Sequence, residues 1–304
     1  MSGLGGAPEF AEAFYRQGAA LADAAIERYG LAAEDVVFLA DRPERDAARI
    51  DGAATKQAIA DALAGIAARA GPADRVLIVL LGHGSAREGE SRFNLRGPDL
   101  GAAELATMLE PLGDRPLAVV NAASASGGFV EALAGAGRVI VTATRSAAER
   151  NATHFGEYFV RALAGADSDV DKDGRVSLLE AFDYARREVE RAYEEENRLL
   201  TEHAVLEDDG DGVGTMEPAP RGGDGALAAR FFLGGGAAGA AVADAPPELR
   251  ALYERRDQLQ EQIEALRARK AEMDPEAYQT QLEALLLELA RTSSEIRARE
   301  GGTR

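Results

Sequence analysis

The stretch that decides the fold runs Val76-Leu77-Ile78-Val79-Leu80-Leu81-Gly82-His83-Gly84-Ser85. Six consecutive apolar residues without alternation predict a strand that is buried on both faces, as in parallel sheets. The strand ends at a glycine, and a histidine follows it directly. In open α/β sheets ligands bind at the carboxyl ends of the strands, so His83 is a candidate site residue.

Apolar runs of the same kind alternate with helical patterns along the first half of the chain. This alternation predicts an α/β domain in which a mainly parallel sheet carries helices on both faces. We expect strands at 35–40, 117–121 and 139–143, and helices at 55–68, 102–112, 127–134 and 152–164.

Residues 169–180 read DVDKDGRVSLLE and match the EF-hand loop at every diagnostic position. Such loops bind Ca²⁺ through oxygens at fixed positions, and helical patterns flank this one on both sides. The alternative is an acidic surface turn without a metal. The candidate ligands are the side chains of Asp169, Asp171 and Asp173, the backbone carbonyl of Arg175, Ser177 directly or through water, and a bidentate Glu180.

A second acidic run, Glu207-Asp208-Asp209-Gly210-Asp211-Gly212, has no acid at the twelfth position of any such loop. Three interpretations stay open for it: a partial metal site, a pocket for a basic side chain, and a solvated turn.

A candidate nucleophile follows the strand that comes after Val76–Leu81. The segment reads Asn121-Ala122-Ala123-Ser124-Ala125-Ser126-Gly127-Gly128. A histidine and a hydroxyl at the ends of neighbouring parallel strands have workable geometry for covalent catalysis. We therefore pair His83 with Ser124, and assign Gly84, Ser126 and Gly127 to a pocket for the developing oxyanion.

Each of these residues also has a structural interpretation. His83 can make a structural hydrogen bond at the end of its strand, and Ser124 can cap the helix that follows it. His154 and His203 are expected to be structural.

The order of His83-Gly84-Ser85 and Ser124-Ala125-Ser126-Gly127, each after an apolar strand, resembles the caspase-like clan and, within it, the legumain family of cysteine peptidases. The resemblance covers roughly residues 3–233. It implies a caspase-like three-layer sandwich and a peptide or protein as substrate or ligand. The family nucleophile is a cysteine, and Ser124 takes its place here. A serine hydroxyl needs a well-placed base, and no carboxylate that would orient His83 stands out in the sequence.

Three functions remain open at this point. The first is a degenerate peptidase that binds a peptide without cutting it. The second is an active endopeptidase that uses the Ser124 and His83 pair. The third is a calcium-binding interaction scaffold.

The last part of the chain has a different pattern. Residues 234–247, rich in Gly, Ala and Pro, predict a linker after the domain at 1–233, with one more strand possible at 230–233. Apolar residues at heptad spacing then predict a helical hairpin or coiled coil over 248–300, broken at Asp274-Pro275. These helices are candidates for homo-oligomerisation.

Composition limits the remaining possibilities. A formal net charge of -18 argues against nucleic-acid binding and favours a soluble protein, and the absence of cysteine excludes disulfides and thiolate catalysis. The sequence contains no membrane span and no signal peptide, and it leaves the compartment open. Gly3-Leu4-Gly5-Gly6 resembles the loop after a first strand, so we expect Met1 to be an internal start, preceded by that strand and an export signal.

Overall fold

The computed structural model describes residues 1–301 except 73, 166–167, 171–174, 235–245 and 269–272. The chain divides into two compact units, Met1–Gly236 and Ala237–Arg304. Each unit is described by itself.

The first unit is built on a four-stranded sheet of order β3-β7-β8-β9. β3 (Val76–Leu80), β7 (Leu117–Asn121) and β8 (Arg138–Thr142) are parallel, and β9 (Val205–Glu207) lies antiparallel to β8. The three parallel strands lie within one residue of their predicted bounds. Their apolar residues face two cores at once, which is why the sequence shows no alternation.

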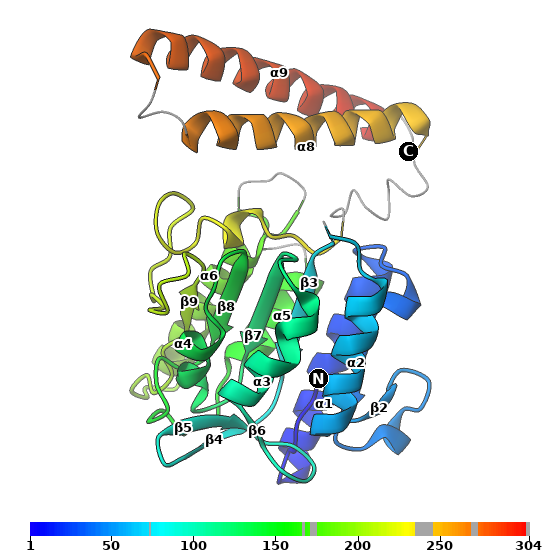
Figure 1. Ribbon diagram of the computed structural model, residues 1–304, viewed down its shortest axis with the longest axis vertical. Coiled ribbons are helices and arrows are strands. Elements are labelled where there is room, and N and C mark those ends of the chain that lie inside the picture. The colour runs from blue at the N-terminus through cyan, green and yellow to red at the C-terminus, as the bar shows by residue number, and fades with distance from the viewer. Residues whose placement is uncertain (73, 166–167, 171–174, 235–245, 269–272, 302–304) are drawn as a thin grey trace. The chain divides into compact units, whose positions relative to one another are not determined.

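Helices cover both faces of this sheet (Figure 1). In β7, Ala118 and Val120 belong to one core, whereas Leu117 and Val119 belong to the other. The mixed α/β class with helices on both faces is therefore confirmed. The first core is covered by α1 (Pro8–Glu27), α5 (Phe155–Ala164) and α6 (Leu178–Glu195), and the second by α2 (Lys56–Arg69), α3 (Ala102–Leu109) and α4 (Phe129–Leu133).

A small antiparallel sheet follows β3 immediately, and the sequence patterns did not predict it. It consists of β4 (Gly84–Arg87), β5 (Glu90–Phe93) and β6 (Leu100–Gly101) in that order. The side chain of Phe93 is fully buried and anchors this sheet to the second core.

The first three residues act as the end of one further strand. Ser2 makes parallel bridges to Ala40 and Leu81. It thereby connects β1 (Leu39–Ala40) with the end of β3. β1 in turn pairs with β2 (Gly52–Ala53). The Met1 ammonium donates to the Val79 carbonyl at 2.7 Å.

A cavity of about 520 Å³ continues from Met1 between the sheet and the helices. Val36, Val37 and Leu77 are among the residues that line it. The strand expected at 35–40 is therefore wrong over most of its length. Only Leu39–Ala40 form a ladder, because residues 36 and 37 face the cavity and have no neighbouring strand in register.

Two more expectations need correction. The helix expected at 102–112 ends at Leu109 and tightens into a 3₁₀ turn over Glu110–Leu112, because Pro111 cannot continue an α-helix. The possible strand at 230–233 reduces to one bridge between Ser177 and Phe232.

The second unit is a helical hairpin. α8 (Pro247–Ala268) and α9 (Pro275–Gly301) run antiparallel, since Arg255 pairs with Glu288 and Arg299 pairs with Glu248. A small apolar core lies between them, formed by Tyr253 and Ile296 with Leu249 and Leu252. In neither unit does the described chain contain a helix of the length and apolarity that crossing a membrane requires.

Candidate functional site

The segments that carry His83 and Ser124 leave the sheet at the same edge. β3 and β7 are parallel, and Leu80 pairs with Asn121, so residues 82–84 and 121–127 follow side by side. We call these two segments the β3–β7 rim. The Ser124 hydroxyl accepts a hydrogen bond from the Gly84 N–H and donates one to the Gly84 carbonyl, both at 3.1 Å.

This double contact leaves the Ser124 side chain little freedom. The residue is 3% exposed. A Cβ on Gly84 would lie 2.0 Å from the Ser124 carbonyl oxygen, so only glycine permits this approach. The hydroxyl proton is directed at a backbone carbonyl instead of at a base, and the Gly84 amide is already occupied.

The His83 imidazole lies against α1. Its ring packs edge-on against Phe10 and Phe14, with centroid distances of 4.5 and 5.0 Å. Burial lowers the pKa of His83, and a hydrogen bond with the Gly5 backbone partly opposes this. The ring is therefore neutral near pH 7, as a general base must be, but it makes no hydrogen bond to the Ser124 hydroxyl.

Ser126 and Gly127 support the loop. Their amide groups donate to the Thr144 hydroxyl at 2.8 and 3.1 Å, and the Ser126 hydroxyl lies 3.1 Å from the same oxygen. A Cβ on Gly127 would lie 2.2 Å from the Ser146 nitrogen. Neither amide is directed at a space that an oxyanion would occupy. The sequence analysis missed Thr144, although its place just after a buried strand was a usable signal.

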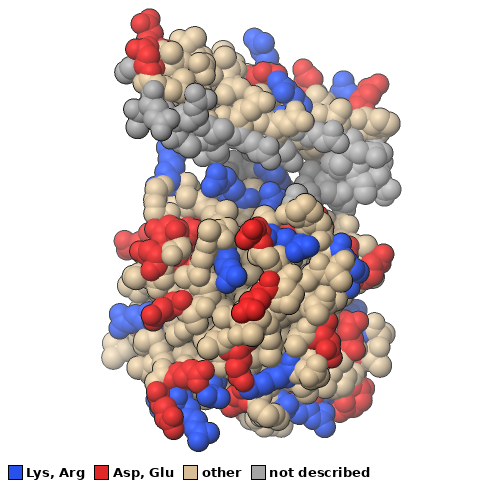
Figure 2. Space-filling model, viewed as in Figure 1, with Lys and Arg blue, Asp and Glu red and all other residues tan. Residues whose placement is uncertain are grey.

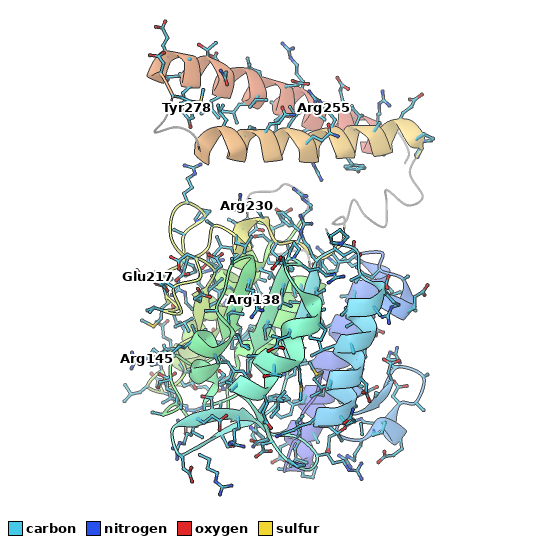
Figure 3. All side chains as sticks on the ribbon, viewed as in Figure 1. Arg138, Arg145, Glu217, Arg230, Arg255 and Tyr278 are labelled. Atoms are coloured by element: carbon cyan, nitrogen blue, oxygen red, sulfur yellow. The ribbon has the colours of Figure 1, made fainter. Side chains whose placement is uncertain are left out.

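A charged group beside the rim was also missed. Ala125 has a left-handed conformation (φ 51°), and its N–H donates to the Glu149 carbonyl at 2.6 Å. The Glu149 carboxylate lies 2.7 Å from Nδ1 of His203 and 3.1 Å from Arg145, which Figure 3 labels. His203 thus holds the loop that follows β8 in place.

His154 lies at the start of α5. Its ring packs edge-on against Tyr193, and its amide N–H donates to the carboxylate of Glu202. The Phe155 amide donates to the same carboxylate at 3.1 Å. Burial raises the pKa of Glu202, and the bonds from these two amides oppose that rise. Glu202 therefore caps the first turn of α5.

In the EF-hand-type loop, Asp171 and Asp173 lie outside the described residues. Ser177 is the N-cap of α6, and its hydroxyl accepts from the Glu180 N–H at 3.2 Å. The Glu180 carboxylate accepts from the Ser177 N–H at 2.8 Å and from the Val170 N–H at 2.9 Å. It therefore spans the loop from the second position to the ninth, which is where a bidentate twelfth ligand has to reach.

The exit of this loop is fixed by the segment that ends the first unit. The Arg175 guanidinium lies 4.1 Å from the centre of the Phe232 ring, and the Leu178 amide donates to the Phe231 carbonyl at 2.9 Å. Asp169, at the first position, is partly exposed. The described residues of the loop are thus compatible with a bound cation.

A separate acidic cluster lies at the opposite edge of the sheet. Glu207, Asp209 and Asp211 each place one carboxylate oxygen within 4.8 Å of the other two, so they could hold a metal ion. Glu207 pairs with Ile140 in the middle of β8, and Gly210 after it lies against Gly135, just before β8 begins, whereas the β3–β7 rim lies where the parallel strands end.

Two cavities of the described chain are lined by no residue of the rim. The larger one continues from Met1, and a smaller one of about 190 Å³ is lined by residues including His203 and Met216. No protein-family model matches the chain, and comparison with curated proteins finds no significant match.

Proposed function

We propose that this chain is a pseudopeptidase of the legumain-like branch of the caspase-like clan, which binds a peptide at the β3–β7 rim without cutting it. The order of the His-Gly and Ser-Gly segments after β3 and β7, and the helices on both faces of the sheet, support this assignment. The observation that carries the proposal is the double hydrogen bond between the Ser124 hydroxyl and Gly84.

The chemistry of a serine nucleophile explains why this contact matters. Attack requires a base that is hydrogen-bonded to the hydroxyl and removes its proton. Here the proton is donated to the Gly84 carbonyl, and His83 packs against Phe10 and Phe14. Activation of Ser124 would break two hydrogen bonds, each with a net value of about 0.5–1.5 kcal/mol, before any chemistry began.

A free strand edge beside the rim favours a peptide as the ligand. β4 is the outer strand of the small sheet and pairs with β5 alone among the named strands. Ser85 and Ala86, in its middle, are partly exposed. An extended peptide can add to such an edge through main-chain hydrogen bonds. Ser124 lies at the start of this edge, where it contacts Gly84.

The main alternative is an active endopeptidase that uses Ser124 and His83. Two observations favour it: the lowered pKa of the half-buried His83 imidazole, and the left-handed backbone of Ala125. Non-glycine residues in this conformation gather at functional sites, where surrounding structure holds the strain. Rotation of the Ser124 hydroxyl away from Gly84 on substrate binding would be the first step of this mechanism.

We also propose that Ca²⁺ occupies the loop at 169–180. Asp169, Asp171, Asp173, the Arg175 carbonyl, Ser177 and Glu180 would supply the oxygens. The capping pair of Ser177 and Glu180 supports this, because it already holds the last ligand across the loop. Calcium here would tie α6 to the end of α5, and both helices belong to the first core.

A cleavage experiment separates the possible functions. The whole chain is incubated with a mixed peptide library, with calcium and with chelator, beside Ser124→Ala, Ser124→Cys and the control Ser85→Cys. The proposal expects cleavage by Ser124→Cys alone, with the unmodified chain retaining the same peptides uncut.

The other outcomes each contradict it. Cleavage by the unmodified chain that is lost in Ser124→Ala establishes the endopeptidase. Cleavage by Ser85→Cys as well would attribute the activity to any exposed thiol. No cleavage and no retained peptide in any form would leave only the calcium-binding scaffold.

Calcium binding is measured in parallel by chemical unfolding. Calcium at roughly a hundredfold excess over its dissociation constant should stabilise the chain by about 2.7 kcal/mol. Glu180→Gln should lose the part of this gain that the loop contributes, whereas Glu194→Gln, an exposed acid on the same helix, should keep the whole gain. Equal gains in both variants would contradict a calcium site in this loop.

A further inference from the structure

The acidic loop after β9 contains a buried carboxylate with an unused oxygen. Glu207 ends β9, and its side chain is 0% exposed. Oε1 accepts from the Gly210 N–H at 2.6 Å and from the Gly212 N–H at 3.4 Å. Oε2 has no hydrogen-bond partner. A buried acceptor left without a partner is unfavourable, and a charged one more so.

The loop turns two further carboxylates toward Glu207. Asp209 and Asp211 each place an oxygen within 4.8 Å of it and of each other. Gly210 and Gly212 have φ values of 86° and 80°, a conformation that favours glycine, and they allow the tight turn. Asp209 and Asp211 each accept one backbone N–H through Oδ1, which leaves Oδ2 of both outside these bonds.

Further acidic side chains lie near the cluster. Asp208 and Asp224 lie in the same loop and accept backbone amides, and Glu131 on α4 lies beside Gly212. Within the described chain, no Lys or Arg forms an ion pair with Glu207, Asp209 or Asp211. In Figure 2, acidic side chains gather over the loop that follows β9. The cluster has the charge that a cation would compensate.

We propose that Glu207, Asp209 and Asp211 form a second calcium site, with Glu207 as the inner ligand and water completing the exposed side. Only oxygens are offered, which selects hard cations. Magnesium requires near-ideal octahedral geometry and gives up its water reluctantly, whereas calcium accepts irregular sets of oxygen ligands. Three carboxylates from one short loop form an irregular set, which favours calcium.

This site is independent of the proposed function. It lies at the edge of the sheet opposite the β3–β7 rim and shares no residue with the loop at 169–180. Bound calcium would hold the loop after β9 against α4, because Gly212 packs beside Glu131 and Gly210 packs beside Gly135.

Calorimetric titration of the whole chain with Ca²⁺ tests the inference. Glu180→Gln is used as the background, so that the EF-hand-type loop does not contribute. In that background we expect the chain to bind about one calcium ion. Adding Glu207→Gln should abolish this binding. Adding Glu217→Gln instead, which removes the same charge from an exposed position of the same loop (Figure 3), should leave binding intact. No binding in the background, or binding that survives Glu207→Gln, would overturn the proposal.

A stability measurement guards against an unfolded variant. Without calcium, Glu207→Gln should be at least as stable as its background, because it removes a buried charge. With calcium it should lose the rise in melting temperature that the background shows. Asp211→Asn, a change at an exposed position, should lose the same rise. If calcium still stabilises both variants, the cation binds elsewhere. Magnesium in place of calcium should bind at least tenfold more weakly, and equal binding would refute the choice of ion.

Discussion

The amino group of Met1 gives a sharp test of how the sheet begins. It donates to the Val79 carbonyl inside the domain, and burial lowers its pKa from 8.0 to about 5. Between these values the unfolded chain binds a proton that the folded chain does not. Stability contributed by this group is therefore complete above pH 8 and falls as the pH decreases toward 5. At about 1.4 kcal/mol per pH unit, the loss is about 4 kcal/mol.

Acetylation of Met1 removes this titration, because it converts the amine into an uncharged amide. We compare the two forms by urea unfolding from pH 5 to pH 8, with intact mass showing that Met1 is retained. His83 and the buried carboxylates titrate in both forms, so their effects cancel in the difference. The free energy of unfolding of the free-amine form, relative to the acetylated form, should rise by about 4 kcal/mol over this range. If the free energies of unfolding of the two forms change with pH in the same way, the amine faces water. Residues 1–3 would then not lie between β1 and β3.

Three substitutions test other parts of the first unit, each by chemical unfolding. Gly84→Ala should destabilise by about 1–3 kcal/mol, because its Cβ would clash with the Ser124 carbonyl; an unchanged stability would mean that this close contact does not form. Gly65→Ala, inside α2 and with its closest contact at 3.4 Å, should instead stabilise by about 0.5–1 kcal/mol. Glu202→Ala should destabilise by about 1–3 kcal/mol, since the amides that open α5 lose their acceptor; a neutral result would indicate that water replaces the carboxylate.

The parallel strands were predictable because a strand buried on both faces appears in the sequence as a continuous apolar run. The centres of β3, β7 and β8 are continuous apolar runs, and helical patterns lie between and after them. The small sheet of β4, β5 and β6 was not predictable in this way. Gly84-Ser85-Ala86-Arg87 has neither apolar alternation nor β-branched residues, and it forms a strand because the end of β3 and the burial of Phe93 place it.

The side-chain contacts at the β3–β7 rim could not be predicted from the sequence either. The sequence order of β3 and β7 is enough to place His83 and Ser124 near one edge. It cannot show that the imidazole packs against Phe10 and Phe14, because these residues lie about 70 positions earlier, on a helix that the sequence analysis did not assign. Nor can it show that the Ser124 hydroxyl is engaged by a backbone group from another strand.

The acidic run at 207–212 was ambiguous for a different reason. Carboxylate density alone does not separate a solvated turn from a metal site. The distinction depends on the burial of Glu207, and that follows from its place at the end of β9, on the same face of the sheet as Val205. A strand of three residues is too short to show an alternating pattern in the sequence. The face on which Glu207 lies is known only once β9 is seen to pair with β8.

β9 is a poor edge for pairing with a strand of a second copy of the chain. It is the last strand of the four-stranded sheet, only three residues long, and an isolated bridge between Leu206 and Thr215 occupies part of its outer side. The turn that follows it carries a dense negative charge. An incoming strand would find few open amides there and would meet electrostatic repulsion, so this border is protected against fibre-like stacking of neighbouring molecules.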